Sequence, residues 1–164
     1  MSIFPTRILL ATEGSEEAEL AALRAVELAD ATDSELHVVH VGVLPTFLES
    51  YPGTLGYSGK LYEQIEEDSR ELLRELSWRV KVAGGTVAGT HLRMGAVDLE
   101  IVALAKELGA DLIVMGCRGH RGIRRAMEGS ISDGVIRHAP CPVLVVGSHE
   151  SAEACEQSAL LQGG

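Results

Sequence analysis

Residues 112–130 read LIVMGCRGHRGIRRAMEGS, a short apolar run that leads directly into a segment rich in glycine and arginine. The apolar run has the length of a buried strand, and the segment after it mixes two residue types: Gly116, Arg118, Gly119, Arg121, Gly122, Arg124, Arg125 and Gly129. Glycines allow successive backbone N–H groups to turn toward one ligand, and a helix that begins at Ser130 would direct its positive end to the same place. The stretch therefore predicts a strand that ends in an anion-binding loop, and phosphate is the anion that fits.

The chain as a whole carries the opposite charge to this loop. Its 164 residues include 24 Asp and Glu against 14 Lys and Arg, a formal net charge of -10. That length suits one domain with a single core. An acidic chain is repelled by nucleic acid and by anionic membranes, so we expect neither as a partner. Four of the 14 basic residues nevertheless lie between residues 118 and 125.

Hydrophobicity and cysteine content indicate the compartment. No apolar run approaches the ~18–20 residues that cross a bilayer, and the N-terminus lacks the pattern of a secretion signal. The three cysteines, Cys117, Cys141 and Cys155, are too few and odd in number for a disulfide framework. We therefore expect a soluble, cytoplasmic protein with reduced thiols.

Apolar runs alternate with segments of helical periodicity along the chain. We expect strands at residues 7–11, 36–43, 86–94, 112–115 and 143–146. Helices are expected after Ser15 and at residues 60–83, 97–108 and 130–137. This alternation is typical of an α/β fold, a single open five-stranded parallel sheet with helices on both faces. The domain would span residues 1–147, and the acidic residues 148–164 would form a flexible tail.

The connection at residues 44–59 contains Pro45, Pro52, Gly53, Gly56 and Gly59 and is expected to have no regular structure. We interpret it as a surface connection. Its aromatic side chains leave open a second role, in which the segment closes over a ligand: Phe47, Tyr51 and Tyr57.

In a parallel α/β sheet, ligands bind beyond the carboxyl ends of the strands, where the winding direction changes. If the first three strands wind one way and the last two the other, the turn at residues 12–15 faces the loop at residues 116–129. Ser15 can cap the helix that follows, whose first turn carries three carboxylates, Glu16, Glu17 and Glu19. These charges complement the positive end of the helix and would repel a phosphate. The phosphate is therefore expected at the arginines.

The histidines do not indicate a metal site. His37 and His40 are three residues apart on an expected strand, so they point to opposite faces and cannot share an ion. We interpret them as structural histidines and predict no metal ligands. Cys117 lies beside the arginines, which favours the thiolate, but a quiet, half-buried thiol is the simpler interpretation.

Two common nucleotide-binding motifs are absent from the sequence. The chain contains neither a Gly-x-x-x-x-Gly-Lys-Ser/Thr P-loop nor a Gly-x-Gly-x-x-Gly fingerprint. The loop also has no lysine, and no acidic pair is placed to hold Mg²⁺ and a hydrolytic water. We therefore expect nucleotide binding without fast turnover.

The spacing of the glycines resembles that of the ATP-binding branch of the universal stress protein family. That branch carries Gly, two residues, Gly, nine residues, Gly and then Ser or Thr, and four residues here match it: Gly116, Gly119, Gly129 and Ser130. The similarity extends over residues 4–147. It includes the Gly-Ser turn after the first strand and His40 in the second. It also includes residues 110–116, which lead into the glycine-rich segment, and residues 138–143, which lead into the last strand.

The resemblance implies an adenine nucleotide alpha hydrolase-like, Rossmann-type fold with strand order 3-2-1-4-5 and the nucleotide at the switch point. It further implies that the phosphates and ribose are held by Gly116, Arg118, Gly119, Gly129, Ser130 and Ile131. The adenine and ribose would be surrounded by Thr12, Glu13, Val41 and Met115. The family usually has Asp where this chain has Glu13, so the carboxylate here lies one methylene farther from the backbone.

We therefore expect a stress-linked, nucleotide-responsive module whose ligand is ATP, with AMP and cyclic AMP as alternatives and Mg²⁺ as an accompanying ion. The apolar strand Val143 to Val146 is expected at the sheet edge, where it would pair with a second copy to form a homodimer, as the resemblance also implies. Two rival hypotheses stay open. One is an enzyme that slowly hydrolyses ATP or another adenylate, and the other is a dimeric interaction module without a nucleotide.

Overall fold

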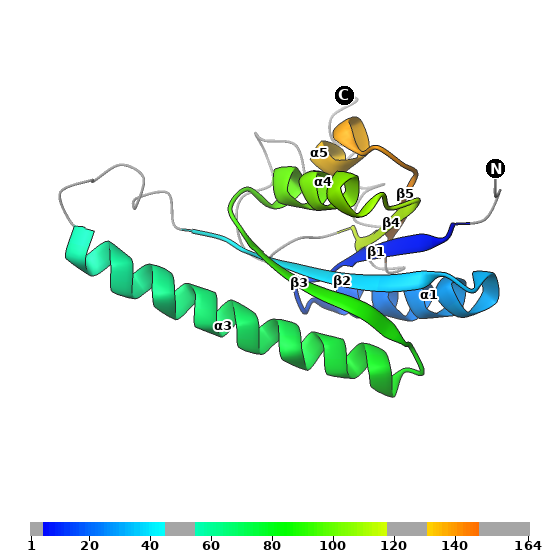
Figure 1. Cartoon of the computed structure of the whole chain (residues 1–164), viewed down its shortest axis with the longest axis horizontal. Coiled ribbons are helices and arrows are strands. Elements are labelled where there is room, and N and C mark those ends of the chain that lie inside the picture. Colours follow the sequence, from blue (N-terminus) through cyan, green and yellow to red (C-terminus); the bar gives the residue numbers. More distant parts are fainter. Residues whose placement is uncertain (1–4, 45–54, 118–130, 148–164) are drawn as a thin grey trace, which may run out of the picture.

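The computed structural model describes residues 5–44, 55–117 and 131–147. Within them, five strands form one sheet in the order β3-β2-β1-β4-β5 (Figure 1). The strands are β1 (Arg7–Ala11), β2 (Glu35–Gly42), β3 (Val87–Met94), β4 (Leu112–Gly116) and β5 (Val143–Val146). All four neighbouring pairs are parallel. The predicted fold class and strand order are therefore confirmed.

Helices cover both faces of the sheet. One layer consists of α1 (Glu16–Thr32) and α3 (Leu55–Val82), and the other consists of α4 (Val97–Leu108) and α5 (Ile131–His138). Figure 1 shows the two layers on opposite sides of the strands, with the long helix α3 lying below β3. The ends predicted for the strands and helices agree with the observed ends to within one residue, except at the start of α3. For α1 only the start was predicted.

Helix α3 begins five residues earlier than the sequence predicts. Glycines and prolines indicated irregular structure up to residue 59, but the helix starts at Leu55 and includes Gly59. That expectation was wrong for residues 55–59, because extending an existing helix costs little, and one glycine adds only about 1 kcal/mol relative to alanine. The rest of the connection lies outside the described residues, together with Phe47, Tyr51 and the side chain of Tyr57.

Alternate residues of β1 face opposite helical layers. Ile8 and Leu10 belong to a cluster with residues of α1 and α3, whereas Leu9 and Ala11 belong to a cluster with residues of α4 and α5. Ile8, Leu9 and Leu10 have no exposed surface. Burial of each such side chain contributes about 1.5–3 kcal/mol. Because both faces of the strand are covered, its sequence is an uninterrupted apolar run.

Asp111 ties the beginnings of β1 and β4 together. Its Oδ2 accepts hydrogen bonds from Thr6 Oγ1 at 2.6 Å, Thr6 N at 2.9 Å and Arg7 N at 3.2 Å. The Thr6 hydroxyl and backbone N–H hold the pKa of this carboxyl below its usual value, with a smaller contribution from Arg7. The ionised carboxyl of Asp111 therefore stabilises the folded protein fully above about pH 3.9, the pKa of this group in the unfolded chain. The contribution is lost as the pH falls through the lower pKa that the group has in the folded protein.

Candidate functional site

A cleft opens at the carboxyl ends of β1, β2 and β4. Its walls are formed by Ala11, Thr12, Glu13, Val39, His40, Val41, Val97, Ile101, Met115, Gly116 and Ile131. Because β2 and β4 lie on opposite sides of β1, this is the point where the winding direction of the sheet changes. The turn after β1 and the end of β4 therefore meet at the place that the sequence analysis predicted.

The cleft is open to solvent. Counting the open part, the space between its walls is about 440 Å³. Its apolar lining includes Val41, Val97 and Met115.

Six of the ten site residues named from the sequence line this cleft: Thr12, Glu13, Val41, Met115, Gly116 and Ile131. The other four, Arg118, Gly119, Gly129 and Ser130, lie outside the described residues. The structure thus brings together every residue that was assigned to adenine. The role of all ten residues in binding a nucleotide stays a prediction.

The turn after β1 is held in place by β2. The N–H of Thr12 donates to the Val39 carbonyl at 3.0 Å, and His40 Nδ1 donates to the Thr12 carbonyl at 2.9 Å. A carbonyl can only accept, so His40 carries a proton on Nδ1. His40 is buried, and its position confirms the structural role predicted for it. This bond fixes the backbone that presents Glu13 to the cleft.

Gly116 has a packing role that the sequence analysis did not recognise. A Cβ at this position would lie 2.9 Å from both the Ala18 nitrogen and the Glu17 carbonyl carbon, which are backbone atoms of α1. The N-terminal turn of α1 therefore rests directly on the end of β4. Glycine is required at Gly116 by this close approach, whether or not a ligand binds nearby.

Helix α4 contributes two wall residues that the sequence analysis did not assign to the site, Val97 and Ile101. Their spacing of four places both on one face of the helix, and Val97 is the first residue of α4. The sequence does show the apolar stripe of this helix to which Val97 and Ile101 belong. It does not show where that stripe lies relative to β1 and β4.

Carboxylates occupy the helix ends beside the cleft. The first turn of α1 carries Glu16, Glu17 and Glu19, and that of α4 carries Asp98 and Glu100. Ser15 caps α1 as predicted, accepting a hydrogen bond from Ala18 N at 3.1 Å. None of the described lining residues is a lysine or an arginine. Within this part of the chain, the cleft therefore offers apolar walls and negative charge.

Residues 5–44, 55–117 and 131–147 contain no group of three or more His, Cys, Asp and Glu residues that could hold a metal ion. They also contain no helix long and apolar enough to cross a membrane. Cys117 and Cys141 are free thiols, and burial raises the pKa of the Cys141 thiol. Cys141 is therefore protonated at neutral pH.

Comparison with known proteins decides the family. The family model described as "Universal stress protein family" matches residues 5–147. The chain belongs to the universal stress protein family. A protein of Staphylococcus haemolyticus that carries the universal stress protein name is 38% identical to it over 147 residues, which are 89% of this chain and 87% of the relative.

Solved structures of universal stress proteins share the fold. UspA from Lactobacillus plantarum has a TM-score of 0.71 at 25% identity, covering 88% of this chain and 99% of its own. A universal stress protein in complex with cAMP has a TM-score of 0.66 at 26% identity, covering 87% and 97%. A universal stress protein from Archaeoglobus fulgidus in complex with dAMP has a TM-score of 0.61 at 25% identity, covering 88% and 99%.

Proposed function

We propose that this universal stress protein binds an adenine nucleotide in the cleft at the switch point, with ATP as the expected ligand. The observation that carries the proposal is the assembly of Thr12, Glu13, Val41 and Met115 in one cleft that Gly116 and Ile131 also line. Relatives of the same fold bind cAMP and dAMP. The ligand would make the protein a nucleotide-responsive stress module of the cytoplasm, a compartment inferred from its few cysteines.

The walls of the cleft suit a purine base. Val41, Val97 and Met115 present apolar surface on which an adenine ring can lie. The Glu13 carboxylate can accept a hydrogen bond from the adenine amino group or a ribose hydroxyl. A base held between apolar side chains and one fixed acceptor is oriented as well as bound.

The phosphates require the segment that follows β4. The described walls carry no lysine or arginine, and the first turn of α1 carries three carboxylates. Charge repulsion therefore directs the phosphates away from α1 and toward Arg118, Gly119, Gly129 and Ser130. With ATP, a Mg²⁺ ion would bridge phosphate oxygens, as this ion commonly does in nucleotide sites.

The carboxylate of Glu13 provides the test of this proposal. Glu13→Ala should weaken ATP binding by about 10-fold, the loss expected for one hydrogen bond to a charged group. Glu13→Asp should bind at least as well as the natural protein, because Asp is the usual residue of the family at this position. Calorimetric titration with ATP, AMP and cyclic AMP measures the effect, and mass spectrometry of denatured protein detects any nucleotide that co-purifies. Absence of binding of all three nucleotides to the natural protein would contradict the proposal.

We also propose that the protein is a homodimer paired through β5. This strand lies at the edge of the sheet, and Leu144 on it is 37% exposed. An apolar edge strand with unpaired backbone groups can pair with the same strand of a second copy. Light scattering at micromolar concentration should give twice the mass of one chain, and Leu144→Arg, which adds charge to the edge, should shift it toward the monomer. A monomeric mass for the natural protein would overturn this proposal.

A further inference from the structure

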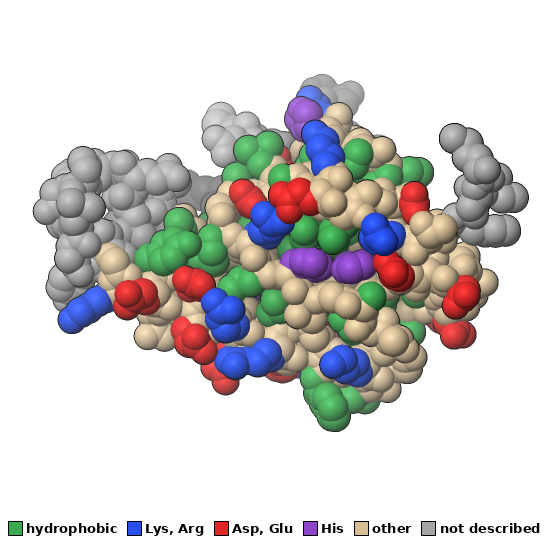
Figure 2. Space-filling view, viewed as in Figure 1, with side chains coloured by type: hydrophobic (Ala, Val, Ile, Leu, Met, Phe, Trp, Pro, Cys, Tyr) green, Lys and Arg blue, Asp and Glu red, His purple; other side chains and the backbone are tan. Residues whose placement is uncertain are grey.

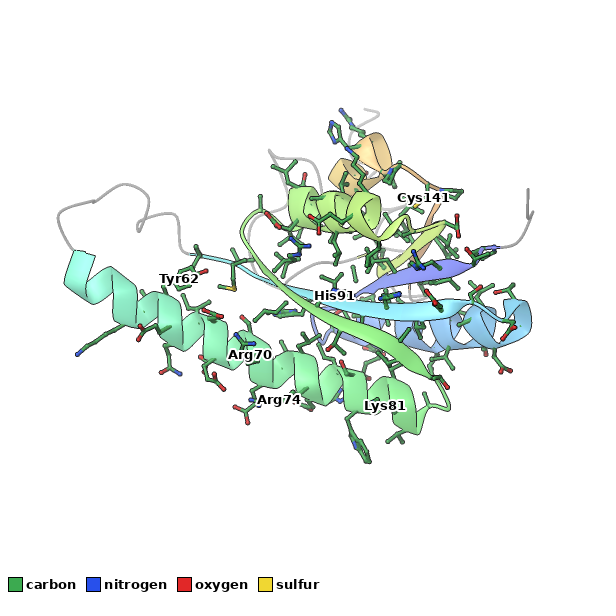
Figure 3. All side chains as sticks on the ribbon, viewed as in Figure 1. Tyr62, Arg70, Arg74, Lys81, His91 and Cys141 are labelled. Atoms are coloured by element: carbon green, nitrogen blue, oxygen red, sulfur yellow. The ribbon has the colours of Figure 1, made fainter. Side chains whose placement is uncertain are left out.

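A pair of histidines lies on the sheet away from the nucleotide cleft. His37 on β2 and His91 on β3 have ring centroids 5.3 Å apart, and His37 Nδ1 lies 3.1 Å from His91 Nε2. Neither residue lines the cleft. Figure 3 places His91 in the middle of the face toward the viewer, and Figure 2 shows two adjacent histidines in purple at the corresponding place on the surface. The pair is therefore reachable from solvent.

The register of β2 and β3 brings these two side chains to the same face. His37 is opposite Gly89, and Val39 is opposite His91, so the histidines occupy diagonal positions on neighbouring strands. The sequence analysis compared His37 only with His40, three residues away, and predicted no metal site. The partner that it missed is separated from His37 by 54 residues.

Gly89 lies directly against the two nitrogens of the pair. A Cβ built on Gly89 would lie 2.8 Å from His37 Nδ1 and 3.1 Å from His91 Nε2. These are the same two nitrogen atoms that face each other across the pair. Even the smallest side chain at this position would collide with the rings, and glycine allows them to meet.

We propose that His37 and His91 chelate one divalent transition-metal ion of the class that prefers imidazole, such as Zn²⁺, Ni²⁺ or Cu²⁺. With metal–nitrogen bonds of about 2.05 Å, the separation of 3.1 Å corresponds to a nitrogen–metal–nitrogen angle of about 98°. That angle lies between the values of square and tetrahedral coordination, so a small rotation of the two rings suffices. Water completes the coordination, because no third described ligand joins the pair.

Two carboxylates lie beside the pair. Glu35 Oε2 lies 3.6 Å from His37 Nε2, the nitrogen on the far side of the ring. When Nδ1 binds a metal, Nε2 carries the proton, and a carboxylate on that side orients the ring and strengthens the ligand. Glu107 lies near His91, as does Arg93. Arg7 pairs with Glu35 and Arg93 pairs with Glu107, so each flank of the pair carries no net charge.

Without a metal, one ring of the pair donates a hydrogen bond to the other.

The test is a titration of the full chain with Ni²⁺ or Zn²⁺, compared between the natural protein and three variants. His91→Gln removes a ligand, and Gly89→Ala places a methyl group against both rings and forces them apart. His138→Gln is the control, since His138 is exposed and bonds the Gly134 carbonyl. Loss of an outer-shell partner alone weakens metal sites by about 10- to 100-fold, so His91→Gln should lose at least that much. Gly89→Ala should lose about 10-fold or more, and the control should not change.

A second measurement separates metal binding from effects on folding. In nitrogen-15 NMR spectra of the imidazoles, Zn²⁺ should shift the signals of His37 and His91 in the natural protein and leave that of His138 in place. Circular dichroism without metal checks that each variant is folded. Equal affinity and stoichiometry in the natural protein and His91→Gln, or unshifted imidazole signals at saturating Zn²⁺, would overturn the proposal and leave the pair as a hydrogen bond between strands.

Discussion

A tryptophan in place of Val97 is expected to weaken the binding of ATP or AMP by at least about 100-fold, or about 2.7 kcal/mol. Val97 is the first residue of α4 and lines the cleft together with Val41 and Met115. An indole at position 97 would fill part of the cleft beside Val41 and Met115, the space that the proposal assigns to the base. Calorimetric titration of the variant and the natural protein measures the loss.

The variant should fold, because Val97 is only partly buried and the larger side chain can extend toward solvent. Val97→Ala is the matched control, since it removes two methyl groups and blocks nothing. Its affinity should fall by about threefold or less, the loss of part of one apolar contact. Unchanged affinity in Val97→Trp would place the base elsewhere, even if the natural protein binds nucleotide.

Replacement of Gly116 by valine is expected to lower the free energy of unfolding by about 3 kcal/mol. This value is near the upper end of the typical cost of inserting extra carbon atoms into a well-packed core. The first added carbon would lie 2.9 Å from backbone atoms of Glu17 and Ala18. Backbone in a capped helix cannot yield as a flexible side chain does, so α1 would have to move away from β4. In a protein of this size such a loss lowers the midpoint of thermal unfolding by about 6–12 °C. Thermal and urea unfolding without nucleotide measure it.

Gly147→Val is the control for this substitution. Gly147 follows β5, the strand beside β4. Among the described residues, a Cβ there would meet the Cys117 side chain, at 3.4 Å for the nearest atom, Sγ. Its effect should stay within about 0.5 kcal/mol, as for most surface substitutions. Unchanged stability of Gly116→Val together with lost nucleotide binding would contradict the packing role and leave Gly116 as a residue that serves only the ligand.

Much of the fold could be predicted because its signals are local. The apolar run of β1 indicated burial on both faces, and Ser15 before three glutamates indicated the start of α1. The strand order came from the resemblance and from the rule for switch points, and the structure confirms it. The start of α3 was predicted wrongly, because glycine residues lower helix propensity without preventing a helix that is already formed.

The candidate site was predictable to the extent that it follows strand ends. Thr12, Glu13, Val41 and Met115 lie at or just beyond the ends of three strands, so parallel pairing alone brings them together. Val97 and Ile101 were missed, because their place in the wall depends on how α4 crosses the sheet. Asp111 entered the sequence analysis only as one of residues 110–116, which resemble the family. Its hydrogen bonds to Thr6 and Arg7 were not predicted, because they join residues more than a hundred positions apart.

By itself, the sequence determined the succession of strands and helices, the cap at Ser15 and the glycine and arginine segment, because periodicity, capping and backbone freedom act over a few neighbouring residues. Only the tertiary structure decided that α1 packs so closely on residue 116 that glycine is required there. It also decided that His37 contacts His91 beside Gly89. Those contacts depend on the register between strands and on the distance between layers. Both are set when the whole core packs, and no short stretch of sequence contains them.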